Sequence, residues 1–136
     1  MPTLRIKQAA ELLGVSDDTV RRWIQQGTLA VEQDESGRKV IAGDVLAEFW
    51  RTNAPPPPSN PLSISSSARN RFVGLVTKVI TDKVMAQVEM QCGPHTVVSL
   101  MSAEAAQELK LQPGSIAVAI VKATNVIVEV PESVQG

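Results

Sequence analysis

The sequence has few aromatic side chains, one cysteine, one histidine and no long apolar run. Only 3% of its 136 residues are aromatic. The four are Trp23, Phe49, Trp50 and Phe72. So few rings argue against an aromatic surface on which single-stranded nucleic acid stacks. Because Cys92 and His95 have no second copy of their kind, one chain can form neither a disulfide nor a Cys/His zinc site, and we expect both to be ordinary loop residues.

Membrane and enzyme signatures are also missing. The first residues lack the apolar run of a signal peptide, and no stretch approaches the roughly 18 apolar residues that span a bilayer. We therefore expect a cytoplasmic protein without a membrane partner. Paired carboxylates, a nucleophile beside a base and a phosphate-binding glycine loop are not recognisable, so we do not expect an enzyme.

A proline-rich stretch separates two parts of different character. Residues 53–67 hold five of the nine prolines and then a serine cluster, which is typical of a semi-rigid polyproline spacer. The apolar pattern is helical before it and alternates with a period of two after it. The sequence predicts an α domain over residues 1–53, a linker over 54–64 and a β domain over 65–136. Positive and negative charges nearly balance in both parts, so net charge does not indicate nucleic acid.

The first domain has the pattern of two helices joined by a tight turn. We expect Gly14 to end the first helix, Ser16 to cap the second and Gly27 to close it. The apolar stripe of the first helix is Ala9, Ala10, Leu12 and Leu13. Such a pair predicts a helix-turn-helix. A strand, a turn at residues 35–37, a returning strand from Arg38 and a helix from Asp44 are expected to follow.

This arrangement resembles the winged helix-turn-helix of the MerR and excisionase families. The matching blocks are residues 9–16, 19–23, 27–29, 37–38 and 44–45. The resemblance implies that the second helix enters the major groove of double-stranded DNA while the hairpin contacts the backbone. The implied contacts are Thr19, Arg21, Arg22, Arg38 and Lys39, and Trp23 is expected to pack internally. A protein-interaction module of the same shape is the alternative.

The second domain has the alternation of a small β structure. Strands are expected over residues 71–80, 83–90 and 95–102, then a helix over 102–110 capped by Ser102, then two strands within 111–130 around a turn at 122–125. Five strands and one short helix are typical of a small OB-like barrel. The fold class is thus a two-domain chain, with a winged helix-turn-helix before an all-β barrel.

The segment from Ser65 to Val130 resembles a Mop domain of the TOBE type, the molybdate-binding module of molbindins, of the molybdate-responsive repressor and of the molybdate transporter ATPase. The blocks that carry the resemblance are residues 67–70, 99–102, 109–114 and 120–126. The resemblance implies a molybdate ligand, with tungstate as an alternative. The implied oxyanion-binding residues are Ser67, Arg69, Ser99, Ser102, Lys122, Ala123 and Thr124.

The chemistry of these residues suits a tetrahedral dianion. Hydroxyls and cations donate to oxyanions, and no carboxylate interrupts the blocks. In molbindins the oxyanion is held between subunits, so the resemblance implies a homo-oligomer, a hexamer by likeness to molbindins or a dimer. Two hypotheses follow: a molybdate-binding, DNA-binding transcriptional regulator, or a storage protein whose helix-turn-helix serves assembly or protein interaction.

Overall fold

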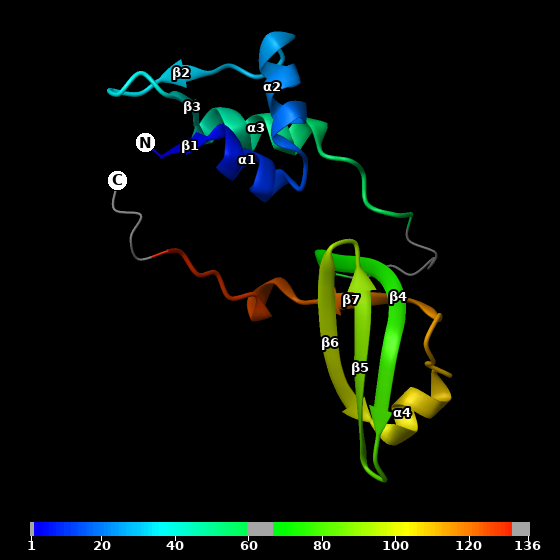
Figure 1. The fold of residues 1–136 in the computed structure, drawn as a ribbon. Coiled ribbons are helices and arrows are strands. Elements are labelled where there is room, and N and C mark those ends of the chain that lie inside the picture. The colour runs from blue at the N-terminus through cyan, green and yellow to red at the C-terminus, as the bar shows by residue number, and fades with distance from the viewer. Residues whose placement is uncertain (1, 60–66, 132–136) are drawn as a thin grey trace. The chain divides into compact units, whose positions relative to one another are not determined.

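The chain forms two compact units, one built on residues 1–56 and one on residues 57–128 (Figure 1). The computed structural model describes residues 2–59 and 67–131, so part of the expected linker and the end of the chain lie outside the described residues. Within these ranges no helix combines the length and the apolar character that crossing a bilayer requires.

The first unit combines three helices with a small sheet. Its elements are β1 (Thr3–Arg5), α1 (Ile6–Leu13), α2 (Asp17–Gln25), β2 (Glu32–Gln33), β3 (Lys39–Ala42) and α3 (Gly43–Asn53). The antiparallel strands lie in the order β1-β3-β2. The helix-turn-helix, the hairpin and the last helix are confirmed. Strand β1 was not expected, because three residues are too few to show alternation.

Local chemistry at the helix ends explains the turn between α1 and α2. Gly14 ends α1 with φ 69°, a left-handed conformation that glycine adopts without steric cost. The Ser16 hydroxyl oxygen accepts the backbone N–H of Thr19 at 3.1 Å and so caps α2. Asp17 and Asp18 occupy the first turn of α2, where negative charge suits the helix dipole.

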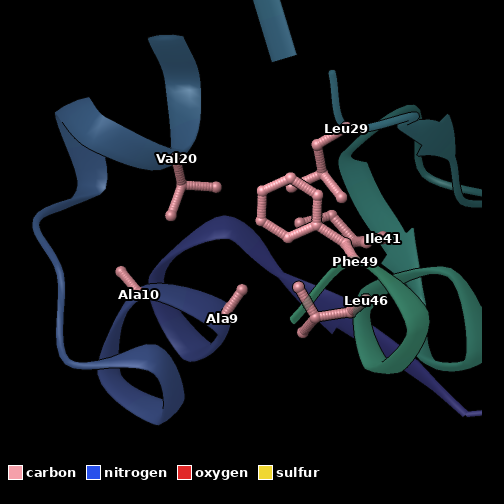
Figure 2. Close-up of a cluster of buried hydrophobic side chains, with 7 residues drawn as sticks. All are labelled: Ala9, Ala10, Val20, Leu29, Ile41, Leu46 and Phe49. Atoms are coloured by element: carbon pink, nitrogen blue, oxygen red, sulfur yellow. The ribbon is translucent and has the colours of Figure 1, made fainter. Parts of the chain in front are cut away.

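The core of the first unit lies between the helices and β3 (Figure 2). Its buried members are Ala9, Ala10, Val20, Leu29, Ile41, Leu46 and Phe49. The expectation that Leu12 belongs to the buried apolar stripe is wrong, because Leu12 is 70% exposed. The buried stripe of α1 is spaced i, i+3, i+4 and i+7 from Ile6, which leaves position 12 on the outer face. Trp23 packs as expected, with its ring centroid 5.0 Å from that of Phe49.

The second unit is a curled antiparallel sheet with one short helix. Its elements are β4 (Asn70–Thr81), β5 (Met85–Cys92), β6 (His95–Ser102), α4 (Ala103–Glu108), β7 (Ile116–Val121) and the 3₁₀ helix η1 (Ala123–Asn125). The strand order is β6-β5-β4-β7, so β6 and β7 are the edges. This is the expected class of fold, an antiparallel β unit with one helix after its third strand.

One face of this sheet carries the apolar core. Val76, Val88 and Met90 are buried on it together with Cys92. Cys92 is therefore not the loop residue expected, because it ends β5 and its thiol donates to the Phe72 carbonyl at 3.7 Å. Gly74 lies against this end of β5, where an added Cβ would clash with the Gln91 carbonyl oxygen and lie 2.7 Å from the Cys92 sulfur. Only glycine fits there.

The fifth expected strand is absent from the described part of the second unit. Beyond η1, residues 126–130 are neither strand nor helix and pair with no strand (Figure 1, orange to red). Within η1 the Asn125 N–H donates to the Lys122 carbonyl at 2.9 Å, which makes a helical turn rather than a hairpin turn. The apolar alternation of residues 126–130 is typical of a strand, but the expectation of a fifth strand is wrong, because these residues join no sheet in the part of the chain that the structure describes.

Candidate functional site

Two of the predicted oxyanion-binding blocks meet at one end of the second unit's sheet. Strands β4 and β7 are antiparallel, and Asn70 at the start of β4 pairs with Val121 at the end of β7. The Asn70 side-chain amide also donates to the Val121 carbonyl at 3.2 Å. Arg69 therefore precedes the same rung of the sheet that Lys122 follows. We call this the cationic end of the sheet.

The cationic end presents donors to solvent. Ser67 and Arg69 are exposed, as are Lys122, Ala123 and Thr124, which form the start of η1. Residues 67–74 and 119–125 contain no carboxylate. Hydroxyl, ammonium and guanidinium groups suit an oxyanion, because each can donate a hydrogen bond and the latter two carry positive charge.

Ser102 lies at the opposite end of the sheet. It pairs with Met85, which follows the turn after β4, whereas Asn70 begins β4. The twelve residues of β4 separate the two ends by roughly 35 Å of strand at about 3.3 Å per residue (Figure 1). One chain therefore does not bring Ser102 together with Arg69 and Lys122.

The local role of Ser102 is confirmed. Its hydroxyl oxygen accepts the Ala105 N–H at 3.0 Å and caps α4. Accepting this bond leaves the hydroxyl proton to donate to another group. The first turn of α4 also holds Glu104, the acidic residue nearest to this block in the sequence.

A second carboxylate near Ser102 was not anticipated. Asp82 begins the turn between β4 and β5, and the Val84 carbonyl of that turn accepts the Ala103 N–H at 2.8 Å. Backbone hydrogen bonds from Met85 and Val84, both 2.8 Å, hold the pKa of Asp82 below its ordinary value. The Ser102 end thus carries fixed negative charge, which makes the cationic end the better place for an anion.

Ser99 lies near the middle of its strand and not at either end of the sheet. It pairs with Val88 near the middle of β6, and its face lines an apolar hollow of about 280 Å³. Val97 and Met101 lie two residues to each side of it on the same face. Ser99 is therefore grouped with the sheet core, in a hollow that Val121, the residue before Lys122, also lines.

In the first unit, the predicted DNA contacts divide between α2 and the hairpin. Arg21 and Arg22 are exposed on α2, and Arg21 forms an ion pair with Asp18 at 3.4 Å. Both side chains of this pair are largely exposed, so the pair contributes little stability and a phosphate can replace Asp18. Thr19 is less available, because its hydroxyl shares a 2.9 Å hydrogen bond with that of Ser16.

The hairpin between β2 and β3 is held by Asp34. Its carboxylate accepts the backbone N–H groups of Ser36 and Arg38, each at 2.9 Å. This fixes the turn that exposes Arg38 and Lys39. Lys39 lines a small hollow of about 100 Å³ together with Arg21, so cations of the hairpin and of α2 border one surface.

Asn70, Asp82 and Asp34 were missed as site-forming residues. Each acts by fixing backbone, through the 3.2 Å bond to Val121, the β4–β5 turn and the hairpin turn respectively. Asp34 stands two residues before Ser36 and three before Gly37, which is a recognisable turn signal, so it could have been found. Asp82 has no glycine or serine in the turn that follows it, so the sequence gives no such signal there. Asn70 could not be found either, because its partner is 51 positions away.

Comparison with known proteins finds one matching family in each of the two units. Residues 3–54 match the family described as "Helix-turn-helix domain", and residues 66–128 match the family "TOBE domain". Over 67 residues, or 48% of this chain, the sequence is 37% identical to the molybdenum transport protein ModE of Herbaspirillum seropedicae and 39% identical to the molybdenum-pterin-binding protein MopB of Rhodobacter capsulatus. Each match spans 25% of the relative's length.

Among solved structures, the molybdate-bound form of the cytoplasmic molybdate-binding protein ModG is 38% identical, with a TM-score of 0.49. That match covers 51% of this chain and 50% of ModG. With both family matches in place, the chain contains a helix-turn-helix domain over residues 3–54 and a TOBE domain over residues 66–128.

Proposed function

We propose that this protein is a regulator that binds molybdate, or tungstate, through its TOBE domain and double-stranded DNA through its helix-turn-helix. It is a binding protein of the cytoplasm rather than an enzyme. The observation that carries the proposal is the Asn70–Val121 rung, which sets Arg69 beside the block that begins at Lys122 in a region without carboxylates.

The ligand class follows from this donor set. Molybdate and tungstate are tetrahedral dianions with no proton to donate at neutral pH, so they need hydrogen-bond donors and positive charge. The cationic end supplies both. Two relatives of this chain are a molybdenum transport protein and a molybdenum-pterin-binding protein by name, which supports molybdenum chemistry for the matched region.

The site is completed between copies of the chain. Ser102 offers a hydroxyl donor but lies at the end of the sheet opposite Lys122. If the hydroxyl and the cations hold one oxyanion, they come from different subunits. A homo-oligomer, with a hexamer preferred to a dimer, is therefore part of the proposal.

The DNA-binding role rests on the surface shared by α2 and the hairpin. Arg21, Arg22, Arg38 and Lys39 are exposed there, and Arg21 and Lys39 border one hollow. Arginine and lysine side chains contact phosphates and guanine edges in helix-turn-helix complexes. Molybdate regulates the protein if it changes how the subunits, and with them these surfaces, are arranged.

Fluorescence anisotropy with duplex DNA, with and without molybdate and over about 50 to 200 mM salt, tests this function. The proposal predicts DNA affinity that falls steeply with salt and that changes when molybdate is added. Molybdate binding without salt-dependent DNA binding contradicts the regulator and favours the storage protein.

A further inference from the structure

A surface hollow of about 510 Å³ lies between α1 and α3 in the first unit. Strand β1 and the two helices provide its lining, which consists of Leu4, Leu12, Leu13, Gly43, Leu46, Ala47, Trp50 and Arg51. The members from α3 are spaced as the residues of one helix face, i, i+3, i+4, i+7 and i+8 from position 43. Apart from Arg51, every side chain of the lining is apolar. We call this surface the α1–α3 face.

Leu12 protrudes at the edge of the hollow. It is 70% exposed, because the buried stripe of α1 leaves position 12 on the outer face of the helix. A polar side chain would serve the fold of one chain equally well at such a position. A large apolar side chain beside an apolar hollow is instead typical of a surface that binds another protein.

The α1–α3 face is separate from the residues proposed to contact DNA. The smaller hollow that Arg21 and Lys39 border shares no lining residue with it. Helix α2 and the hairpin between β2 and β3 contribute nothing to its lining. A partner that covers the α1–α3 face therefore leaves α2 and the hairpin accessible to DNA.

The charges around the α1–α3 face are complementary to those of an identical face. Glu11 is exposed beside Leu12, so the protruding leucine has an acid next to it. Arg51 places a base in the lining of the hollow, and its pair with Glu48 at 2.7 Å is largely exposed. An exposed pair of this kind holds its arginine only weakly, so Arg51 can also bind a second carboxylate.

We propose that the α1–α3 face binds the same face of a second copy of this chain about a twofold axis. Leu12 of each copy enters the hollow of the other beside Ala47 and Trp50, and Glu11 of each copy pairs with Arg51 of the other. A twofold interface uses one patch on both copies, so each of these contacts occurs twice. The protruding leucine and the hollow, like the acid and the base, are both present on one chain, which is what a twofold interface requires.

The size of the face also favours a second copy as the occupant. Eight lining residues are fewer than the roughly 20 to 30 residues that a standard interface uses on each side. A contact of this size needs the high effective concentration that an existing link between the partners provides. The homo-oligomer of the proposed function provides that link, and it brings identical helix-turn-helix domains together.

The pairing has a consequence for DNA recognition, which rests on the proposed function. A single DNA-binding module contacts little DNA, and helix-turn-helix proteins gain specificity by binding two half-sites as dimers. Two copies of α2 related by a twofold axis match an inverted repeat of one half-site. The interface itself requires neither DNA nor molybdate.

Cross-linking of the full-length chain without DNA or molybdate tests the interface. Chains bearing Leu12→Cys and Ala47→Cys, with different tags, are co-expressed, treated with a short bismaleimide and resolved on a denaturing gel. Because each chain has only one of the two substitutions, a product that carries both tags joins two copies, and we expect this product. Cysteine is small and apolar, and the other half of the twofold contact keeps its leucine. The native Cys92 is buried.

Val45→Cys replaces Ala47→Cys in the matched control. Val45 is 36% exposed on the same helix but does not line the hollow, because two positions along a helix differ by about 200° around its axis. Its cross-linking yield with Leu12→Cys should be several-fold lower than that of Ala47→Cys. Equal yields, or no product with Ala47→Cys, overturn the proposal.

A charge exchange tests the orientation of the two copies. Glu11→Arg on the Leu12→Cys chain sets two bases against each other and should lower the yield several-fold, and Arg51→Glu on the Ala47→Cys chain should restore it. Both residues are exposed, so these substitutions should leave the fold intact. A yield that Glu11→Arg leaves unchanged, or that Arg51→Glu does not restore, also overturns the proposal. If cross-linking follows this pattern but anisotropy detects no DNA binding, the proposed function fails and the interface stands.

Discussion

The side-chain amide of Asn70 donates a hydrogen bond to the carbonyl oxygen of Val121 at 3.2 Å and ties the first residue of β4 to the last residue of β7. Arg69 and Lys122 flank this rung, so the bond sets the spacing between the two cations proposed to hold the oxyanion. The hydrogen bond contributes little energy, but it lies beside the proposed oxyanion site.

Replacing Asn70 with alanine should weaken molybdate binding more than it weakens the fold. We expect a loss of about 1 kcal/mol in unfolding free energy, the usual worth of one such bond, and a several-fold rise in the Kd for molybdate. Thr77→Ala is the matched control, because the Thr77 hydroxyl also donates to a backbone carbonyl, that of Glu89 at 3.2 Å. Equal effects of the two variants on calorimetric affinity would show that Asn70 has no special link to the site.

Substitutions of Ser102 separate its capping role from ligand binding. Ser102→Ala removes the cap of α4, so it should lower the unfolding free energy by about 1 kcal/mol. It should also lower the affinity for molybdate. Ser102→Asp retains a capping oxygen, so stability should be kept, while its negative charge should abolish binding of a dianion. Ser16→Ala, which removes the equivalent cap of α2, is the control and should leave molybdate binding unchanged. Molybdate binding by Ser102→Asp at wild-type affinity would exclude Ser102 from the site.

Charge changes on α2 should alter DNA binding in opposite directions. Arg21→Ala should lower the affinity and reduce the slope of log K against log salt by about 1, the value for one lost phosphate contact. Asp18→Asn should raise the affinity, because it removes the carboxylate that pairs with Arg21. Arg51→Ala on α3, where Arg51 pairs with Glu48 at 2.7 Å, is the control for general loss of charge. Anisotropy titrations in which Arg21→Ala and Arg51→Ala act alike would exclude α2 as the DNA-contacting helix.

The pKa of Asp82 predicts a pH-dependent contribution to stability. Backbone hydrogen bonds from Met85 and Val84 lower this pKa, so the ionised carboxylate stabilises the folded state above the ordinary pKa, and the contribution is lost as pH falls through the lowered pKa. Asp82→Ala should therefore be less stable than the wild type near neutral pH, and the difference should shrink in acid, as pH falls through the lowered pKa. Urea unfolding of the wild type and of Asp82→Ala, near neutral pH and in acid, measures this difference in stability. A difference that does not change with pH would show that the carboxylate charge is not what stabilises the turn.

Local signals in the sequence accounted for most of the fold. Glycine at position 14 and serine at positions 16 and 102 act within three residues of themselves, so helix ends and caps were predictable. The failures lie where long-range packing decides. Strand β1 is defined by its pairing with β3, and residues 126–130 have the composition of a strand but form none among the residues that the structure describes.

The candidate site was predictable as chemistry but not as geometry. The resemblance to Mop domains implied Arg69, Ser102 and Lys122, and their residue types agreed with it, yet which of them meet depends on the register of the strands. The pairing of Asn70 with Val121 joins two of them, and the pairing of Met85 with Ser102 places the third at the other end of the sheet. Neither pairing can be predicted from the sequence around the residues that it positions.

Isothermal titration calorimetry on the intact protein tests the central claim most directly. Molybdate, tungstate and sulfate are titrated into the wild type, into Arg69→Ala and Lys122→Ala, and into Lys83→Ala, which removes an exposed lysine from the β4–β5 turn. We predict that Lys83→Ala binds molybdate or tungstate with the same affinity as the wild type. Arg69→Ala and Lys122→Ala should each lose about 10- to 100-fold in affinity, which corresponds to one charge-assisted hydrogen bond. Wild-type protein that binds none of the three anions, or undiminished binding by both Arg69→Ala and Lys122→Ala, would contradict the account.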